Sequence, residues 1–337
     1  MNTALTSRRN FLQACGAGVT LLGVASLGGQ AFAHAPVDRL RVLCGYPSGS
    51  APDIVARAVA AELGGSYARG ATVDNVAGAS GCKAVAALKA SPADGSTLLV
   101  APGTAASVLP YLFAARPYDP ELDLKPVSVA VVSQLWLVVG PVVPTSVTDA
   151  RELLAWMHDN PKLAAVGTTG ASGAGERAHL MMAKRFLEAG IAWEQVGFNG
   201  APQVVSALLG GQLAAAIVSE VPLRSHVKAG KLRVLATSGA RRNAAVPSVG
   251  TFAEQGFRKL VADDWFGCFL PGAAAPAAVD AMSQRLRVAL AQPKLVAALA
   301  DVGLTAAPCT PAGMTARIEA ERNLWEPVIK AHNIRVG

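Results

Sequence analysis

The chain has 337 residues, of which 52% are hydrophobic and 16% are charged, so about two domains with a sizeable core are expected. The low charge, together with 33 Gly and 21 Pro residues, excludes a coiled coil and a charged disordered chain. The formal charge is +7, but the Lys and Arg residues are scattered and no basic run exceeds Arg241-Arg242. This pattern argues against a nucleic-acid partner.

The N-terminal segment has the layout of an export signal. Arg8-Arg9 precede an uncharged, weakly apolar run over residues 14–27, and the small-x-small site Ala31-Phe32-Ala33 follows. The paired arginines resemble a twin-arginine signal, which a receptor reads and which is not a membrane anchor. We therefore expect a signal peptide over residues 1–33, cleavage near Ala33 and a mature protein in the periplasm.

The mature chain alternates short apolar runs with helical patterns that begin and end at Gly, Pro or capping residues. The predicted strands are 40–44, 72–74, 97–101, 136–139, 164–167, 214–218, 232–236 and 265–270. The predicted helices are 53–63, one that ends near residue 89, 150–158, 176–188, 203–209, 277–290 and 311–330. The alternation predicts an α/β fold with largely parallel sheets.

Signatures of catalysis and metal binding are absent from the sequence. There is no G-x-S-x-G elbow, no phosphate-binding G-x-x-x-x-G-K-[ST] loop and no H-E-x-x-H, and the five His residues lack metal-like spacing. Gly173 and Gly175 match part of a dinucleotide fingerprint but lie too far from the preceding strand. We expect no catalytic residue, no metal and no cofactor. The mature cysteines lack C-x-x-C spacing and are expected to be free thiols: Cys44, Cys82, Cys268 and Cys309.

Three loops share the pattern of a predicted strand, a polar or Gly-rich turn and a helix: 46–53, 168–176 and 199–202. Free backbone N–H groups at a helix N-terminus favour a carboxylate or another small anion. The alternative is ordinary turn chemistry, because every fold of this class has such loops. We expect the first two loops to face each other across a cleft and to share one anionic ligand. The candidate ligand-binding residues are Tyr46, Pro47, Ser48, Gly49, Ser50, Thr168, Thr169, Ser172, Asn199 and Gly200.

Asp53 has two interpretations. It lies three residues after Ser50, so the pair fits a capping box, in which its carboxylate would only support the helix N-terminus. It could instead accept a hydrogen bond from a donor group of the ligand or from a bridging water. The sequence leaves both open, and Asp53 is kept as a candidate site residue.

A series of motifs resembles the Bug family, the extracytoplasmic solute-binding subunits of tripartite tricarboxylate transporters. Each motif is weak alone, but seven follow in the family's order from about Leu40 to Ile334. They are Tyr46-Pro47-Ser48-Gly49, Asp53-Ile54-Val55-Ala56-Arg57, Pro92-Ala93-Asp94-Gly95-Ser96-Thr97-Leu98-Leu99, Pro117-Tyr118-Asp119-Pro120, Leu208-Leu209-Gly210-Gly211-Gln212, Lys228-Ala229-Gly230-Lys231-Leu232-Arg233 and Trp265-Phe266-Gly267.

The resemblance implies a type II periplasmic-binding-protein fold, with two α/β lobes joined by a hinge and a ligand cleft between them. By this analogy the first lobe holds residues 36–138 and 267–337, and the second holds residues 139–266. The implied function is a receptor that captures a small organic carboxylate and delivers it to the membrane subunits of the transporter. The implied protein is a monomer.

The chain departs from the family pattern at several places in the implied site. The first loop has Ser50, Ala51 and Pro52 where Gly-Gly-Thr is usual, and Gly103-Thr104 replaces a loop richer in hydroxyl groups. Ser219-Glu220 stands where many members carry Asp-Asn, and Glu220 would repel a second carboxylate or pair with an amine if it reached the cleft. Gly103, Thr104 and Ser219 are therefore added to the candidate ligand-binding residues. Two other functions stay open: a secreted hydrolase on a similar fold, and a ligand sensor that partners a signalling protein.

Overall fold

A computed structural model describes residues 37–169, 194–198, 200–258, 260–261 and 263–331. The strands are β1 (Leu40–Cys44), β2 (Ala71–Asn75), β3 (Thr97–Pro102), β4 (Leu124–Val139), β5 (Ala165–Thr169), β6 (Glu194–Phe198), β7 (Ala215–Ser219), β8 (Arg233–Thr237), β9 (Asp263–Pro271) and β10 (Thr305–Ala306). The helices are α1 (Ala51–Leu63), α2 (Cys82–Lys89), α3 (Thr104–Ser107), α4 (Pro120–Asp123), α5 (Ala150–Asp159), α7 (Ala201–Leu209), α8 (Arg224–Lys228), α9 (Pro276–Leu290), α10 (Pro293–Asp301) and α11 (Pro311–Ala331).

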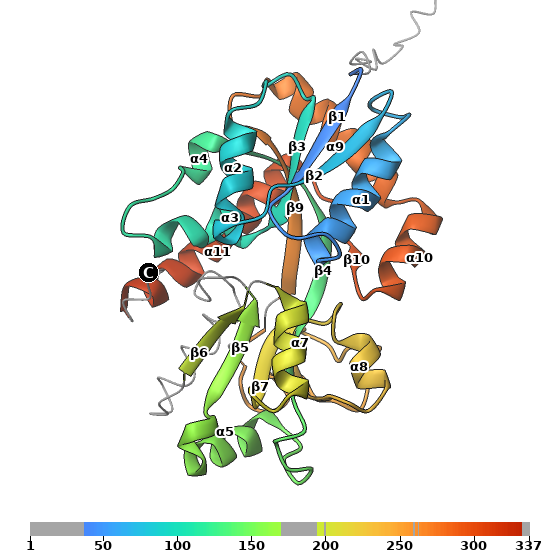
Figure 1. Ribbon diagram of the computed structural model, residues 1–337. Helices are drawn as coiled ribbons and strands as arrows, with labels where there is room; N and C mark the ends of the chain where they lie inside the picture. Colours follow the sequence, from blue (N-terminus) through green and yellow to red (C-terminus); the bar gives the residue numbers. More distant parts are fainter. Residues whose placement is uncertain (1–36, 170–193, 199, 259, 262, 332–337) are drawn as a thin grey trace, which may run out of the picture. The chain divides into compact units, whose positions relative to one another are not determined.

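The described strands join in the order β2-β1-β3-β9-β4-β7-β5-β6, with β8 and β10 also paired to β4 (Figure 1). β4 pairs with β9 over residues 124–134 and with β7 over residues 135–139. This long strand therefore belongs to two α/β halves, one built on β1–β3 and the other on β5–β8. The result is the predicted α/β fold of two lobes that share long connecting strands.

The expectation of largely parallel sheets holds only in part, because parallel pairing is confined to two groups of short strands. β1 is parallel to β2 and β3, and β5 is parallel to β6 and β7. Every antiparallel pairing among the described residues involves β4 or β9. β4 and β9 are also the long strands that connect the two halves. Each runs antiparallel to the shorter strands beside it.

Several elements differ from the sequence prediction. β4 begins at Leu124 rather than at residue 136, and β6 and α10 were not predicted. Pro126 interrupts the apolar pattern early in β4, and the pairing with β9 shifts register between Pro126 and Ser128. A proline can occupy such an irregularity because no ladder hydrogen bond is required there. The helix predicted at 176–188 lies outside the described residues.

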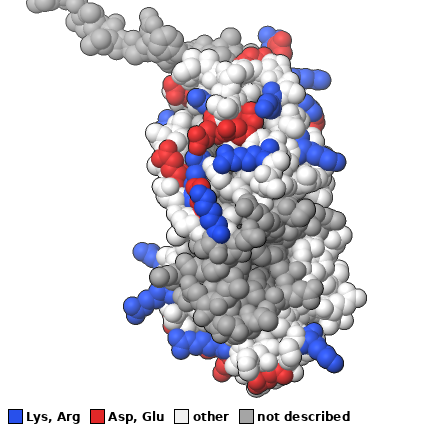
Figure 2. Space-filling model, turned by 90° about the vertical axis from the view of Figure 1, so that its left-hand side faces the viewer, with Lys and Arg blue, Asp and Glu red and all other residues white. Residues whose placement is uncertain are grey.

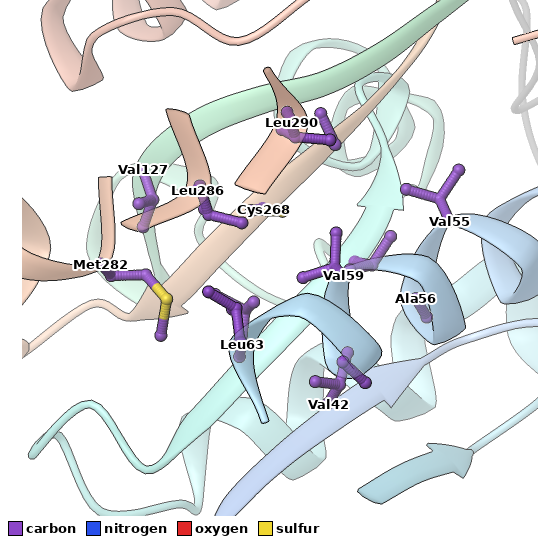
Figure 3. Packing of buried hydrophobic residues seen from close by; sticks show 14 of the residues in the cluster. Val42, Val55, Ala56, Val59, Leu63, Val127, Cys268, Met282, Leu286 and Leu290 are labelled. Carbon is purple, nitrogen blue, oxygen red and sulfur yellow. The ribbon is translucent and has the colours of Figure 1, made fainter. Parts of the chain in front are cut away.

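The core of the first half is made by α1 and α9 against the sheet (Figure 3). Val55 and Val59 of α1 face Met282 and Leu286 of α9, with Cys268 of β9 in the same cluster. All five side chains are at most 1% exposed. The helical spacing predicted for 277–290 is confirmed, because Val279, Met282, Leu286 and Leu290, which share one face, are all buried. Burial of this kind contributes roughly 1.5–3 kcal/mol for each large aliphatic side chain.

The surface charges are mixed on the face shown in Figure 2, where acidic and basic side chains lie interspersed. Elsewhere in the described chain, charged side chains form ion pairs such as Arg322 with Glu121 and Lys330 with Glu326. The described residues of that face therefore present no basic stripe of the kind that follows a phosphate backbone.

Candidate functional site

A cavity of about 730 Å³ opens beyond the ends of several strands. Residues from both halves of the sheet line it, so it is shared between the two lobes. The lining consists of residues 45–52, Ile54, 77–80, Pro102, Thr104, 200–203, 218–219, 221–222, Asp264, Phe266 and Val302.

The topology explains why these segments meet. β2, β1 and β3 are parallel neighbours, so the residues that follow Asn75, Cys44 and Pro102 leave the sheet at one edge. β6 is parallel to β5, and β5 to β7, so the residues that follow β6 and β7 also leave their sheet together. Ligands of α/β proteins bind beyond the carboxyl ends of the strands for this reason. The sequence analysis predicted the site in the loops that follow the strands because parallel strands end on the same side of a sheet.

The first loop is held by Asp53, which is 1% exposed. Its Oδ2 accepts hydrogen bonds from the backbone N–H of Gly49 at 2.8 Å and from Arg57 Nε at 2.9 Å, and Oδ1 accepts one from Asn75 Nδ2 at 2.7 Å. Asn75 Nδ2 also donates to the carbonyl of Tyr46 at 3.0 Å. The carboxylate therefore ties the loop after β1 to the end of β2 and to α1.

This network decides between the interpretations of Asp53. The capping box is wrong, because the Ser50 backbone N–H donates to the carbonyl of Pro47 and the Ser50 hydroxyl makes no capping bond. Asp53 is also not among the lining residues, and its oxygens face protein donors. It is a positioning residue for the loop that lines the cavity.

The pKa of Asp53 predicts a pH dependence of stability. Burial raises this pKa, but hydrogen bonds from Arg57, Asn75 and Gly49 outweigh burial and hold it below its ordinary value. The charged network therefore stabilises the fold at pH above about 4, the usual aspartate value, and this contribution disappears as pH falls through the lower folded-state pKa. Urea unfolding should show a free energy of unfolding that falls below pH 4. In Asp53→Asn the fall should be shallower, and equal slopes in the two proteins would contradict the prediction.

A Gly-rich segment forms a second wall that the sequence analysis did not assign to the site. Ala79 and Ser80 have φ values of 47° and 53°, and they lie between Gly78 and Gly81, whose φ values are also positive. Such strain in non-glycine residues persists where the surroundings fix it, as at binding sites. The Tyr46 hydroxyl donates to the carbonyl of Ser80 at 3.4 Å, which links this wall to the first loop. The strand–glycine–helix pattern shared with the three predicted loops could have identified it.

The structure brings eight of the candidate residues to the cavity: Tyr46, Pro47, Ser48, Gly49, Ser50, Thr104, Gly200 and Ser219. Three others lie away from its lining, namely Asp53, Gly103 and the fully buried Thr168. Ser172 and Asn199, and the side chain of Thr169, lie outside the described residues. The part of the 168–176 loop after Thr169 therefore stays a prediction.

Glu220 does not reach the cavity, although its neighbour Ser219 does. The Glu220 side chain is buried and accepts hydrogen bonds from Asn243 Nδ2 at 3.0 Å and Arg224 Nε at 3.2 Å. Burial raises the pKa of Glu220 despite these partners. Glu220 therefore neither repels a second carboxylate of a ligand in the cavity nor pairs with its amine by direct contact.

The cavity lining carries almost no charge. Within the described part of the chain, it contains no Lys, Arg, His or Glu, and its one acidic residue is Asp264. Uncharged polar groups come from the backbone of the loops and from the side chains of Tyr46, Ser48, Ser50, Ser80, Thr104, Gln203 and Ser219. A ligand anion would therefore be held by neutral donors and by the helix dipoles rather than by an arginine clamp.

Metal and thiol chemistry are not organised around the cavity. In the segments the structure describes, no group of three His, Cys, Asp or Glu residues is placed to hold a metal ion. The four described cysteines are free, as predicted, and burial raises the pKa of Cys44 to about 11 and that of Cys268 to about 12. The thiols of Cys44 and Cys268 are therefore unreactive at neutral pH, because the thiolate is the reactive form. None of the described helices has the length and apolarity that crossing a membrane requires.

Two α/β lobes that share long strands, with a cavity lined from both, define a ligand receptor of the periplasmic-binding-protein class. The chain belongs to the tripartite tricarboxylate transporter receptor family, whose model matches residues 55–334. It is 30% identical to the protein BugT of Bordetella pertussis, over 88% of this chain and 89% of that protein. The resemblance to the Bug family is thus confirmed.

Solved structures agree with this family assignment. A periplasmic transporter matches with a TM-score of 0.81 and 27% identity, over 90% of this chain and 99% of that chain. A protein of R. palustris solved with adipate matches with a TM-score of 0.80 and 25% identity, over 89% of this chain and 99% of that chain. These likenesses also confirm the predicted fold class.

Proposed function

We propose that the protein is a periplasmic receptor that captures a small organic carboxylate in the cavity and passes it to the membrane subunits of a tripartite transporter. The observation that carries the proposal is the cavity itself, which lies beyond the ends of parallel strands of both halves and is lined by neutral donors. Membership of the receptor family and the adipate bound to a relative of similar fold support it.

In this proposal the lobes comprise residues 36–138 with 267–337, and residues 139–266, and they close over the ligand by bending at β4 and β9. Ser48, Thr104 and Ser219 supply hydroxyl donors, and the backbone of residues 46–50 and 200–202 supplies N–H donors. The protein performs no catalysis, so the bound ligand leaves unchanged. A purified protein that converts its ligand, and loses this activity on one Ser, Cys or His substitution, would overturn this part.

A thermal-unfolding screen of carboxylates tests the proposal. A ligand at a hundred times its Kd should add about 2.7 kcal/mol of stability. Replacing Ser48 and Ser219 by alanine should reduce the affinity by roughly 0.5–1.5 kcal/mol for each hydrogen bond lost. Ser91→Ala is the control, because Ser91 bonds the carbonyl of Ala87 within the α2 region and does not line the cavity. Equal affinity in the Ser48/Ser219 double variant and the control would place the ligand elsewhere.

Export by the twin-arginine route gives a separate prediction. Replacing Arg8 and Arg9 by lysine keeps the charge but removes the paired guanidinium groups, so the precursor should stay in the cytoplasm. Cell fractionation with detection of the tagged protein measures this, and Arg39→Lys, just after the expected cleavage site, is the control. An unchanged periplasmic yield would exclude the twin-arginine route and leave another export route.

A further inference from the structure

Three aliphatic side chains give the cavity an apolar wall. Ile54 belongs to the first turn of α1, Val221 follows β7 and Val302 follows α10, and all three line the cavity. Each is half-buried and packs against the core cluster of the first half that Figure 3 shows. The apolar wall is therefore an edge of that core and not a set of isolated surface residues.

A largely buried ion pair holds two of these side chains in place. Arg224 Nε donates to Glu220 Oε2 at 3.2 Å, and Arg224 Nη1 donates to the carbonyl of Asp301 at 3.0 Å, at the end of α10. Each of the two acceptor residues directly precedes a valine of the apolar wall, Val221 or Val302. Since Arg224 belongs to the second half and α10 packs on the core of the first, this contact fixes the two valines relative to each other. A wall that is fixed before the ligand arrives loses little freedom on binding, which favours affinity.

The size and the surface of the cavity favour a hydrocarbon body. A volume of about 730 Å³ lies within the range of pockets that enclose most of a drug-sized ligand, so there is room for a body well beyond two or three carbons. Water beside the apolar wall is released when a hydrocarbon replaces it, and the gain grows with the area covered. A hydroxylated body would lose hydrogen bonds to water at this wall, and aliphatic side chains offer none in return.

We infer that the apolar wall is the subsite for the body of the ligand, and that the ligand class is carboxylates with an extended aliphatic body. The inference rests on the proposed function, in which the backbone of residues 46–50 and 200–202 binds the carboxylate. The protein then binds longer aliphatic acids more tightly than short ones, and more tightly than sugar acids of equal length. Ile54, Val221 and Val302 are the specificity-determining residues.

Calorimetric titration of the purified protein with butyrate, hexanoate, octanoate and gluconate tests the inference. The affinity should rise about fourfold for each methylene added, the fold-change that corresponds to about 0.8 kcal/mol for a buried methylene. Gluconate has six carbons like hexanoate but carries a hydroxyl on each carbon of its body, so it should bind at least about tenfold more weakly. An affinity that does not grow with chain length would overturn the inference, and so would gluconate binding as tightly as hexanoate.

A Val221→Thr/Val302→Thr double variant tests the residues themselves. Threonine has nearly the shape of valine but replaces one methyl group by a hydroxyl, so the ratio of octanoate to butyrate affinity should fall at least about threefold. Val296→Thr is the matched control, because Val296 is 40% exposed on α10 and does not line the cavity. It makes the same chemical change and should keep the ratio.

The possible failures are distinguishable. An unchanged ratio in the double variant, shown to be folded by its circular dichroism, would overturn the inference. Binding of gluconate or succinate without binding of hexanoate or octanoate would also overturn it and would leave the proposed function standing. If no carboxylate binds at all, the proposed function fails and the inference fails with it.

Discussion

Replacing Gly103 by alanine is expected to destabilise the protein by about 1–3 kcal/mol or more, the usual cost of forcing extra volume into a packed interior. A Cβ at Gly103 would lie 1.9 Å from Cε2 and 2.1 Å from Cζ2 of Trp265. The ring cannot simply move away, because Trp265 is fully buried and its Nε1 donates to Glu321 Oε1 at 2.6 Å. The Gly103 N–H also donates to the carbonyl of Trp265 at 2.8 Å, which fixes the two backbones together.

The same substitution should weaken ligand binding. Trp265 stands between Asp264 and Phe266, which both line the cavity, so a shifted ring displaces two of its walls. Urea unfolding and ligand titration measure the two effects. Gly70→Ala is the control, because a Cβ there would meet nothing within 4 Å, and its stability should hardly change. A Gly103→Ala protein as stable and as tightly binding as Gly70→Ala would contradict the packing argument.

Gly103 illustrates what a sequence can and cannot reveal about a site. The family pattern assigned this position to the site, but Gly103 lies outside the cavity lining, next to Thr104, which does line the cavity. The reason for glycine there is the approach of an indole ring from a strand more than 150 residues away in the sequence. The residues next to Gly103 in the sequence give no indication of this contact with Trp265.

Helices and strands were predictable from the sequence where the spacing of apolar residues is regular. α1 and α9 have apolar faces at helical spacing, and short strands such as β3 are nearly continuous apolar runs. The first half of β4 was not predictable in this way, because Pro126, Ser128 and two register shifts break its pattern. Its identity as a strand comes from pairing with β9, which is a long-range interaction.

The sequence was sufficient to predict which loops line the cavity, but not which side chains from distant strands contact it. Strand, glycine and helix in succession identified the loops at 46–50 and 200–202, since the geometry of parallel strands brings such loops together. Asp264 was missed because it lies inside a strand, in an acidic pair that resembles solvated surface. Only the long-range pairing of β9 between β3 and β4 brings it to the cavity.

Replacing Asp53 by alanine should have the largest effect on the first loop. The carboxylate accepts hydrogen bonds from Gly49, Arg57 and Asn75, and its removal should cost about 1–3 kcal/mol of stability. Without this anchor the loop must be ordered each time a ligand binds, at roughly 1–2 kcal/mol for each backbone residue fixed. The affinity for the best carboxylate should therefore fall at least about tenfold.

A second Asp–Arg pair in the same half separates this positioning role from the general loss of a salt bridge. Asp74 pairs with Arg41 at 2.6 Å, but both side chains are about half exposed, at 40% and 46%. Such a pair contributes about 0–1 kcal/mol, so Asp74→Ala should leave stability nearly unchanged and the affinity intact. Titration of the same carboxylate into Asp53→Ala and Asp74→Ala distinguishes a positioning role from the loss of a salt bridge. Neither Asp53 nor Asp74 lines the cavity, so neither substitution removes a direct ligand contact. Only the loss of a carboxylate that holds the loop in place should weaken binding, and equal affinities in the two variants would show that Asp53 merely stabilises the fold.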